Sequence, residues 1–380
     1  PADVAAKFKA EYGKTLLPVE DFKTTISDEG QYDPPVLVSN KIPQTPLKVV
    51  KADAETGNRI PLAASFELYD ADGDLVTYTL HFPDEEVVST WTTNERGELT
   101  LPMVLGEGCY FLKEVAAPEG YVLDSEPAAF TVSADYRGWD DPIVLTFEDA
   151  PQKGTVTVSK TDSETGLPVD GSTYIVKAEG DVSTPDGTLR YADGQIVATL
   201  TTDAEGRATS EPLYLGTYTV YEAKAKDGYA LDVAEKSVAL TYQGQEVSVF
   251  DEQIDVIDAP TELQIVKVSS IDGETPIEGA TFWIWNDAGD FDETPTTDAG
   301  GIMALKYLKH GSYHMQEVAA ADGYVIDDVD DEGKARIHDF QVNDHGCHGR
   351  RAHADQARHR GREHAQDHGH NRDRRRQRRP

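Results

Sequence analysis

Three near-copies of one motif determine what this chain of 380 residues can fold into. Each copy has an opening that starts with lysine, then a turn that starts with Thr-Thr, then a segment that contains Gly-Tyr. The last segments read GCYFLKEVAAPEGYVLD (108–124), GTYTVYEAKAKDGYALD (216–232) and GSYHMQEVAAADGYVID (311–327). Their openings KADAETG, KTDSETG and KVSSIDGETP recur at intervals of roughly 100 residues, a common domain size. The sequence therefore predicts three tandem domains.

Short runs within each repeat, such as TVTVSK, LVTYTLHF and YTVYE, alternate apolar and polar residues with period two. Gly, Asp, Asn and Pro separate these runs at the spacing typical of a sandwich, so we expect an all-β chain. The linkers at 148–154 and 257–262 are short, which favours an elongated, stiff rod. The predicted segments are a remnant of a preceding domain at 1–43, domains at 44–150, 151–259 and 260–345, and a tail at 346–380.

In the repeats, apolar residues that share one face of a predicted strand are followed, on the same face, by a charged residue. This residue is a lysine in the first strand, a glutamate in the strand before Gly-Tyr and an aspartate in the closing strand. The residues are Lys51, Lys160 and Lys267; Glu114, Glu222 and Glu317; and Asp149 and Asp258. One such lysine usually extends to solvent. The recurrence instead indicates that two complete domains each direct a Lys, a Glu and an Asp into their own core.

Buried separately, these charges would cost several kcal/mol per ion. Burial lowers the pKa of a lysine and raises that of a carboxyl, so a neutral amine can meet a neutral acid. Held side by side, the two groups gain an effective concentration that can remove roughly 7–11 kcal/mol from a barrier. A neighbouring Glu can shuttle the protons. The expected product is an amide between two side chains, formed with loss of water.

The motifs V-x-V-x-K-x-D-x-E-T-G, T-T-D-x-x-G and Y-x-V-x-E-x-x-A-P-x-G-Y, present nearly in full, resemble those of Cna-B, SpaA-like domains of Gram-positive surface proteins. The resemblance covers about residues 44–345 and implies Ig-like, prealbumin- or transthyretin-like sandwiches with an intramolecular isopeptide bond. By position, it implies bonds Lys51–Asp149 and Lys160–Asp258, with Glu114, Glu222 and Glu317 as the assisting carboxyls. The chain departs from the family in two places: AKAKDGY lacks the usual Pro, and D-A-P replaces the commoner N-x-P.

The N-terminal segment VLVSNKIP (36–43) places Val36, Val38 and Asn40 in phase. Asn40 precedes Lys51 by the same interval by which Asp149 precedes Lys160. We therefore expect Asn40 to be the bond acceptor of a preceding domain.

The C-terminal repeat has Lys267 but no visible acceptor, because the composition changes sharply after residue 345. The His- and Arg-rich residues 346–380 are predicted to be a disordered tail. A basic tail of this kind could bind nucleic acid, metal or membrane. We favour an out-of-frame translation that replaced the closing strand and left Lys267 unbonded. Sequencing the gene through codon 346 separates these readings.

Composition excludes several classes of protein. The net charge of -34 argues against nucleic acid as a partner. Cys109 and Cys347 make no disulfide framework, and no apolar run of about 18 residues predicts membrane insertion. The chain begins at Pro1 without a signal peptide, so we expect it to be a fragment. We predict no cofactor and no metal: YDADGDLVTY (69–78) lacks key residues of a calcium loop and is read as a hairpin turn.

The sequence thus favours the structural stalk of a bacterial adhesin or pilin-like protein, extracellular and attached to the cell wall. The resemblance implies sortase and the cell wall as partners, although no LPxTG motif is present. An enzyme is not expected, because the bond forms once. The alternative is an extracellular module that binds host glycan or matrix protein through exposed aromatics such as Trp91, Trp139 or Trp283. Trp283 and Trp285 share one face of a strand, for which core packing is the default.

Overall fold

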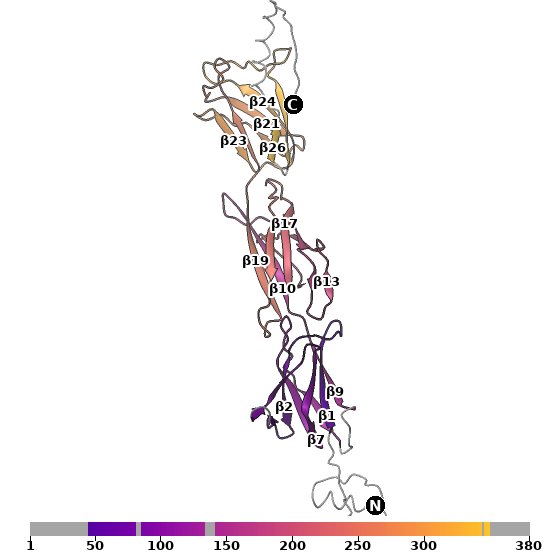
Figure 1. Cartoon of the computed structure of the whole chain (residues 1–380). Coiled ribbons are helices and arrows are strands. Elements are labelled where there is room, and N and C mark those ends of the chain that lie inside the picture. The colour runs from indigo at the N-terminus through magenta and orange to yellow at the C-terminus, as the bar shows by residue number, and fades with distance from the viewer. Residues whose placement is uncertain (1–44, 81–84, 134–140, 344–345, 350–380) are drawn as a thin grey trace, which may run out of the picture. The chain divides into compact units, whose positions relative to one another are not determined.

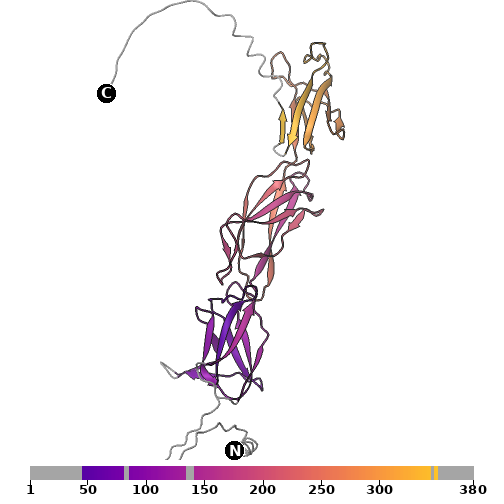
Figure 2. The ribbon, with the colours of Figure 1, turned by 90° about the vertical axis from the view of Figure 1, so that its right-hand side faces the viewer.

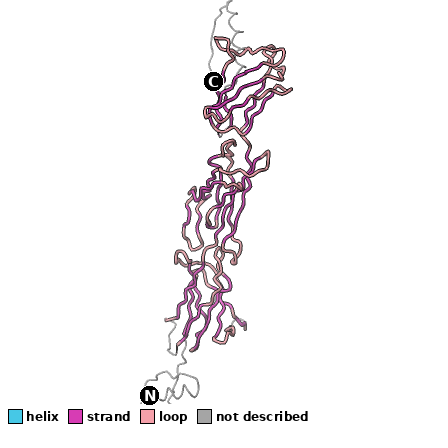
Figure 3. Tube along the Cα trace, turned by 180° about the vertical axis from the view of Figure 1, so that it is seen from behind, coloured by secondary structure: helices cyan, strands magenta, loops and turns pink. Residues whose placement is uncertain are grey.

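The computed structural model describes residues 45–80, 85–133, 141–343 and 346–349. These residues form strands and loops, with no helix among them (Figure 3). The strands build three successive domains, so the predicted all-β class is confirmed (Figure 1). The described part of the chain has no helix long and apolar enough to cross a membrane.

Domain 1 is a sandwich of two sheets with strand orders β6-β1-β9 and β5-β2-β7-β8, plus the small hairpin β3-β4. The strands are β1 (Thr45–Asp53), β2 (Ser65–Asp70), β3 (Tyr78–Leu80), β4 (Glu86–Val88), β5 (Thr90–Thr92), β6 (Glu98–Leu105), β7 (Gly108–Ala116), β8 (Ala128–Val132) and β9 (Ile143–Asp149). Strand β9 runs parallel to β1, while β6 pairs with the other edge of β1 in antiparallel orientation. The first and closing strands of the domain are therefore direct neighbours.

The alternation of β1 directs Leu47, Val49 and Lys51 to the inner face, where all three are fully buried. Leu47 and Val49 pack with Phe66 and Leu112 from the facing sheet in one apolar core. The predicted inward phase of the first strand is thus observed in domain 1, and it extends to the lysine.

Domain 2 repeats this plan. Its sheets have the orders β15-β10-β16, with β19 also paired to β10, and β14-β11-β17-β18; β12 and β13 form a separate hairpin. The strands are β10 (Lys153–Asp162), β11 (Thr173–Ala178), β12 (Val182–Ser183), β13 (Leu189–Tyr191), β14 (Ile196–Thr201), β15 (Arg207–Thr209), β16 (Leu213–Tyr214), β17 (Gly216–Lys224), β18 (Lys236–Leu240) and β19 (Val249–Asp258). As in domain 1, the closing strand lies next to the first strand.

The described residues of domain 3 form one sheet of five strands, ordered β22-β21-β24-β25-β26, and a second sheet of two strands, β20-β23. The strands are β20 (Glu262–Val266), β21 (Thr281–Asn286), β22 (Asp292–Glu293), β23 (Ile302–Lys306), β24 (Gly311–Ala319), β25 (Ile337–Asn343) and β26 (Gly346–Gly349). Among the described residues, no strand takes the place beside β20 that β9 takes beside β1.

Strand β26 differs from the prediction that residues 346–380 are a disordered tail. Its four residues pair in antiparallel register with β25 and extend the larger sheet at its edge (Figure 2). The physical reason is local: a chain that turns back on an exposed strand edge can satisfy backbone groups regardless of its side chains. Residues 350–380 lie outside the described residues.

The chain divides into two compact units. The first holds domain 1 and most of domain 2; the second holds domain 3 with residues 162–165, 224–231 and 258–260. The rod-like arrangement of the whole chain stays a prediction.

Within the first unit, the β12–β13 hairpin joins domain 2 to domain 1. Arg190 donates from Nη2 to Asp53 Oδ2 at 3.1 Å, and its Nη1 lies 2.9 Å from Glu55 Oε2. The hydroxyl of Tyr121 donates to the same Asp53 oxygen at 3.0 Å. Asp53 is fully buried, so this ion pair is shielded from solvent and fixes the junction between the two domains.

Candidate functional site

In domain 1 three charged side chains from distant parts of the sequence meet in the core. Lys51 comes from β1 and Asp149 from the end of β9 in the same sheet, whereas Glu114 comes from β7 in the facing sheet. Lys51 Nζ lies 2.5 Å from Asp149 Oδ1 and 2.5 Å from Glu114 Oε2. All three side chains are fully buried. One amine is thus held between two carboxyls in a site without solvent.

Burial governs the protonation of these carboxyls. Desolvation raises the pKa of Glu114 to about 8, against the opposing effect of Lys51 and with a further rise from the charge of Asp149. Desolvation likewise raises the pKa of Asp149, although Lys51 acts in the opposite direction. Both carboxyls are therefore more readily protonated here than in water. The site favours the neutral acid that an amine can attack.

This arrangement has the parts of an amide-forming reaction. The Lys51 nitrogen is a nucleophile beside the Asp149 carboxyl, and a protonated Glu114 can give a proton to the oxygen that leaves as water. Because the fold holds the two reacting groups together, the entropy of bringing them into contact is already lost on folding.

A pH-dependent loss of stability is expected when the lysine is removed. In Lys51→Met the cation that lowers both carboxyl pKa values is gone, so desolvation by burial, which raises both, acts without its main opposing effect. A raised pKa means that the folded state keeps a proton that the unfolded state releases. Its stabilisation is complete below the ordinary pKa of 4.5 and is lost as the pH rises through the raised pKa of the folded state.

Calorimetry of Lys51→Met at about pH 4 and about pH 9 measures this loss, with the wild-type chain as the control. Domain 1 of the variant should unfold at a clearly lower temperature at the higher pH, beyond any change in the wild type. An equal or higher unfolding temperature at the higher pH would show that these carboxyls are not held protonated by burial.

Domain 2 holds the corresponding residues. Lys160 Nζ donates to Glu222 Oε1 at 2.7 Å, and the Asp232 backbone amide donates to Glu222 Oε2 at 2.9 Å. Lys160 is fully buried. Asp258 is buried at the end of β19, the strand that pairs with β10. Asp258 thus ends the closing strand of domain 2 as Asp149 ends that of domain 1.

Tyr174 is a site residue that the sequence patterns did not predict. Lys160 Nζ donates to its hydroxyl at 2.8 Å. Domains 1 and 3 have Phe66 and Phe282 at the equivalent strand position, so only domain 2 offers this oxygen. The available signal was a tyrosine in the run TYIV where the other repeats have SFEL and TFWI.

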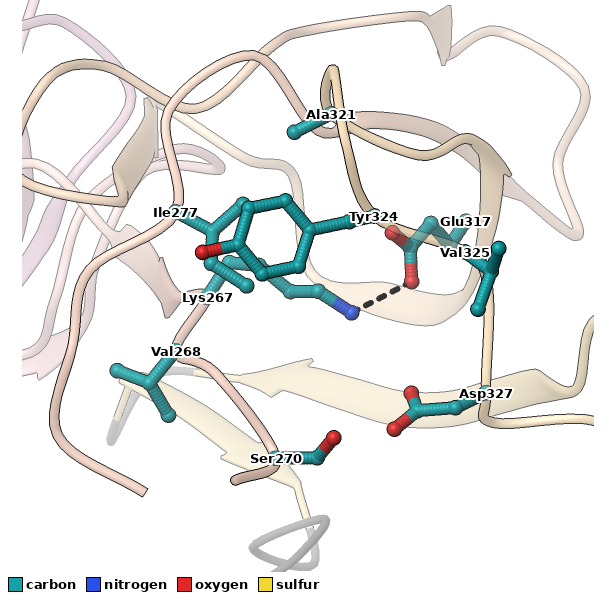
Figure 4. Close-up of a pocket in the computed structure, with 9 residues that line it drawn as sticks. All are labelled: Lys267, Val268, Ser270, Ile277, Glu317, Ala321, Tyr324, Val325 and Asp327. Carbon is teal, nitrogen blue, oxygen red and sulfur yellow. Dashed lines mark hydrogen bonds and ion pairs between the residues drawn. The ribbon is translucent and has the colours of Figure 1, made fainter. Parts of the chain in front are cut away.

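Domain 3 holds half of such a site. Lys267 Nζ donates to Glu317 Oε2 at 2.7 Å, as the dashed line in Figure 4 shows. The Lys267 side chain is 20% exposed, whereas those of Lys51 and Lys160 are 0% exposed. Within the residues that the structure describes, no closing strand with an aspartate lies beside β20. Asn40, the acceptor predicted for a preceding domain, lies outside the described residues.

The structure also shows where the tryptophans and the loop after Tyr69 lie. Trp91 is buried in the core of domain 1 and offers no exposed platform, and Trp139 lies outside the described residues. The prediction of core packing for Trp283 and Trp285 is wrong: Phe282 and Ile284 of the same strand face the core instead. The segment after Tyr69 forms a tight turn in which Asp70 Oδ1 accepts from the Asp72 and Asp74 amides. No cluster suited to a metal occurs among the described residues.

Tandem β-sandwiches, each with a lysine and a carboxyl side chain meeting at its core, define a class of repeat domain. The chain belongs to the family described as SpaA, prealbumin-like fold domain, which matches residues 45–139, 154–253 and 261–345. This confirms the resemblance and the three prealbumin-like domains. The family is one of structural domains and not of catalysts. The curated proteins include no match to this chain.

Solved structures with a similar fold come from bacteria. The chain is similar to the Bacillus anthracis TIE protein at 24% identity and a TM-score of 0.52, over 81% of this chain and 49% of that one. It thus spans about half the length of that protein. It is also similar to BcpA, the major pilin subunit of Bacillus cereus, at 15% identity and a TM-score of 0.36, over 79% of this chain and 95% of that one. A third is GBS52, the minor pilin of Streptococcus agalactiae, at 18% identity and a TM-score of 0.24, over 60% of this chain and 99% of that one.

Proposed function

We propose that this chain is a stalk segment of an extracellular, cell-wall-attached bacterial adhesin or pilin-like protein. Its first two domains are closed by autocatalytic isopeptide bonds, Lys51–Asp149 and Lys160–Asp258. Membership in a family of tandem structural domains supports the general role. Sortase and the cell wall are the partners proposed for anchoring the complete protein.

The observation that carries the proposal is the position of Lys51 Nζ, 2.5 Å from Asp149 Oδ1 in a fully buried site. A buried ion pair without a bond would keep a desolvation cost of several kcal/mol per ion. Amide formation removes both charges. It also links the first strand of the domain to the last, so that force passes along the covalent bond and the other strands carry none of it.

Intact mass spectrometry tests the proposed chemistry. The native chain should be lighter than its sequence by two water molecules. Glu114→Gln and Glu222→Gln should each restore one water, because each removes the proton shuttle of one domain while keeping the side-chain size. Glu317→Gln is the matched control and should leave the deficit unchanged. A native chain with the full sequence mass would rule out both bonds.

A second function, binding of host glycan or matrix protein, is favoured by one observation in domain 3. The rings of Trp283 and Trp285 stack with centroids 4.0 Å apart on the face of β21 turned away from the core, next to His314. Half-buried, stacked indoles of this kind suit contacts with sugar rings. Binding to immobilised glycans and matrix proteins should be lost in the double variant Trp283→Ala/Trp285→Ala and kept in Glu317→Gln. Equal binding by both variants would show that this face is not the binding site.

A further inference from the structure

The hydroxyl of Tyr174 is a buried polar group beside the nucleophile proposed for domain 2. Tyr174 lies on β11, and only 3% of its surface is exposed. Its hydroxyl accepts a hydrogen bond from Lys160 Nζ at 2.8 Å, and the centroid of its ring lies 5.2 Å from the same nitrogen. Burial of a hydroxyl costs free energy that a phenyl ring avoids. A role in the site would explain why this position holds tyrosine.

The other two repeats show that the fold itself does not require this hydroxyl. Phe66 of domain 1 and Phe282 of domain 3 occupy the position of Tyr174, and both are buried in the cores of their domains. Each lies directly opposite the glutamate of its domain, Phe66 opposite Glu114 and Phe282 opposite Glu317. Directly opposed residues of an antiparallel pair share one face of the sheet. An aromatic ring therefore fills the space beside the glutamate in every repeat, and tyrosine adds one oxygen that can accept a hydrogen bond.

The amine of Lys160 is held by two acceptors from the facing sheet. Glu222 Oε1 accepts at 2.7 Å and the Tyr174 hydroxyl at 2.8 Å. These acceptors lie on the neighbouring strands β17 and β11. Glu222 is fixed in turn, because its Oε2 accepts from the Asp232 backbone amide at 2.9 Å. A chain of hydrogen bonds from Asp232 through Glu222 and Lys160 to Tyr174 thus sets the orientation of the amine.

This orientation matters for the direction of attack. A neutral primary amine has two N–H groups and one lone pair, so two fixed acceptors leave one direction for the lone pair. Glu222 and Tyr174 both belong to the facing sheet, and the lone pair is therefore turned back toward the sheet of β10 and β19. Asp258 is buried at the end of β19. A nucleophile that is aimed before the reaction has less rotational freedom to lose in the transition state.

We propose that Tyr174 is a positioning residue for the bond between Lys160 and Asp258, an inference that rests on the proposed isopeptide chemistry. The Lys160 nitrogen attacks Asp258 Cγ, the new C–N bond forms, and the bond from Cγ to the hydroxyl oxygen of the neutral acid breaks. Glu222 takes one amine proton and gives a proton to the departing hydroxyl, which leaves as water. The N–H that faces Tyr174 stays on the amide nitrogen, and the tyrosine keeps its own proton.

Refolding of the full chain tests this role. Chains recovered unfolded from inclusion bodies, with the full sequence mass confirmed at the start, begin folding when the denaturant is diluted. Samples are quenched in acidic denaturant after increasing times. Digestion and mass spectrometry then give the fraction of Lys160 joined to Asp258 and, separately, the fraction of Lys51 joined to Asp149.

Tyr174→Phe should close domain 2 roughly tenfold more slowly than the wild type, which corresponds to a barrier higher by about 1.4 kcal/mol. Domain 1 of the same molecules should close at the wild-type rate and serves as the internal control. A short protease pulse at each time reports folding separately from closure. Domain 2 should become resistant equally fast in both chains, because phenylalanine fills the same space.

The outcomes separate this inference from the proposed function. Equal closure rates of domain 2 in the two chains would overturn the role of Tyr174 and leave the bond standing. A variant whose domain 2 stays sensitive to protease would also overturn it, because Tyr174 would then be needed for folding. A wild-type chain that folds but leaves Lys160 and Asp258 unjoined would overturn the proposed bond of domain 2 together with this inference.

Discussion

Pulled from its two ends, the wild-type chain should show no unfolding step for domain 2, whereas Glu222→Gln should show one. With Lys160 bonded to Asp258, force enters through β10 and leaves at the end of β19 without loading the strands between them. Without the bond, those roughly 100 residues extend, which adds roughly 340 Å of chain. Single-molecule force spectroscopy measures this gain directly.

The matched control is Glu317→Gln, which alters the equivalent glutamate of a domain with no acceptor on a described closing strand. It should extend like the wild type. A wild-type chain that already releases the full length of domain 2 would contradict a covalent path from Lys160 to Asp258.

The second large effect is on thermal stability. Loss of the bond in Glu114→Gln should lower the free energy of unfolding of domain 1 by about 4–5 kcal/mol, since a closed loop of about 100 residues restricts the unfolded chain. For a domain of this size, that corresponds to a fall in Tm of roughly 20 °C or more. The Lys51–Asp149 pair would then also remain buried as separate groups.

Scanning calorimetry checks this, with Glu98→Gln as a control on the domain surface. Glu98 pairs with Lys48 and Arg59 outside the core cluster, so its replacement should change the Tm little. If domain 1 had the same Tm in Glu114→Gln as in the wild type, its stability would come from packing and not from the proposed bond.

The sequence predicted the central features of the three cores because their pattern is local and repeated. Period-two alternation places Lys51, Glu114 and Asp149 on inward faces without any knowledge of the turns between strands. The three glutamates share one position in the strand before Gly-Tyr, and the structure places each within 2.7 Å of its lysine.

Other features depend on information that alternation does not carry. The pattern shows that Trp283 and Trp285 share a face of β21 but not that this face is the outer one, which is decided by where Phe282 and Ile284 pack. Arg190 meets Asp53 because the β12–β13 hairpin of domain 2 reaches domain 1, and the repeated motifs give no sign of that contact. The hydroxyl of Tyr174 is a single-atom difference from phenylalanine at a position that is aromatic in every repeat.

Peptide mapping of the native protein tests the central claim most directly. After digestion, mass spectrometry should detect branched peptides in which Lys51 is joined to Asp149 and Lys160 to Asp258, each one water lighter than its two parts. Linear peptides that contain these four residues unmodified, recovered in full yield from folded protein, would contradict it.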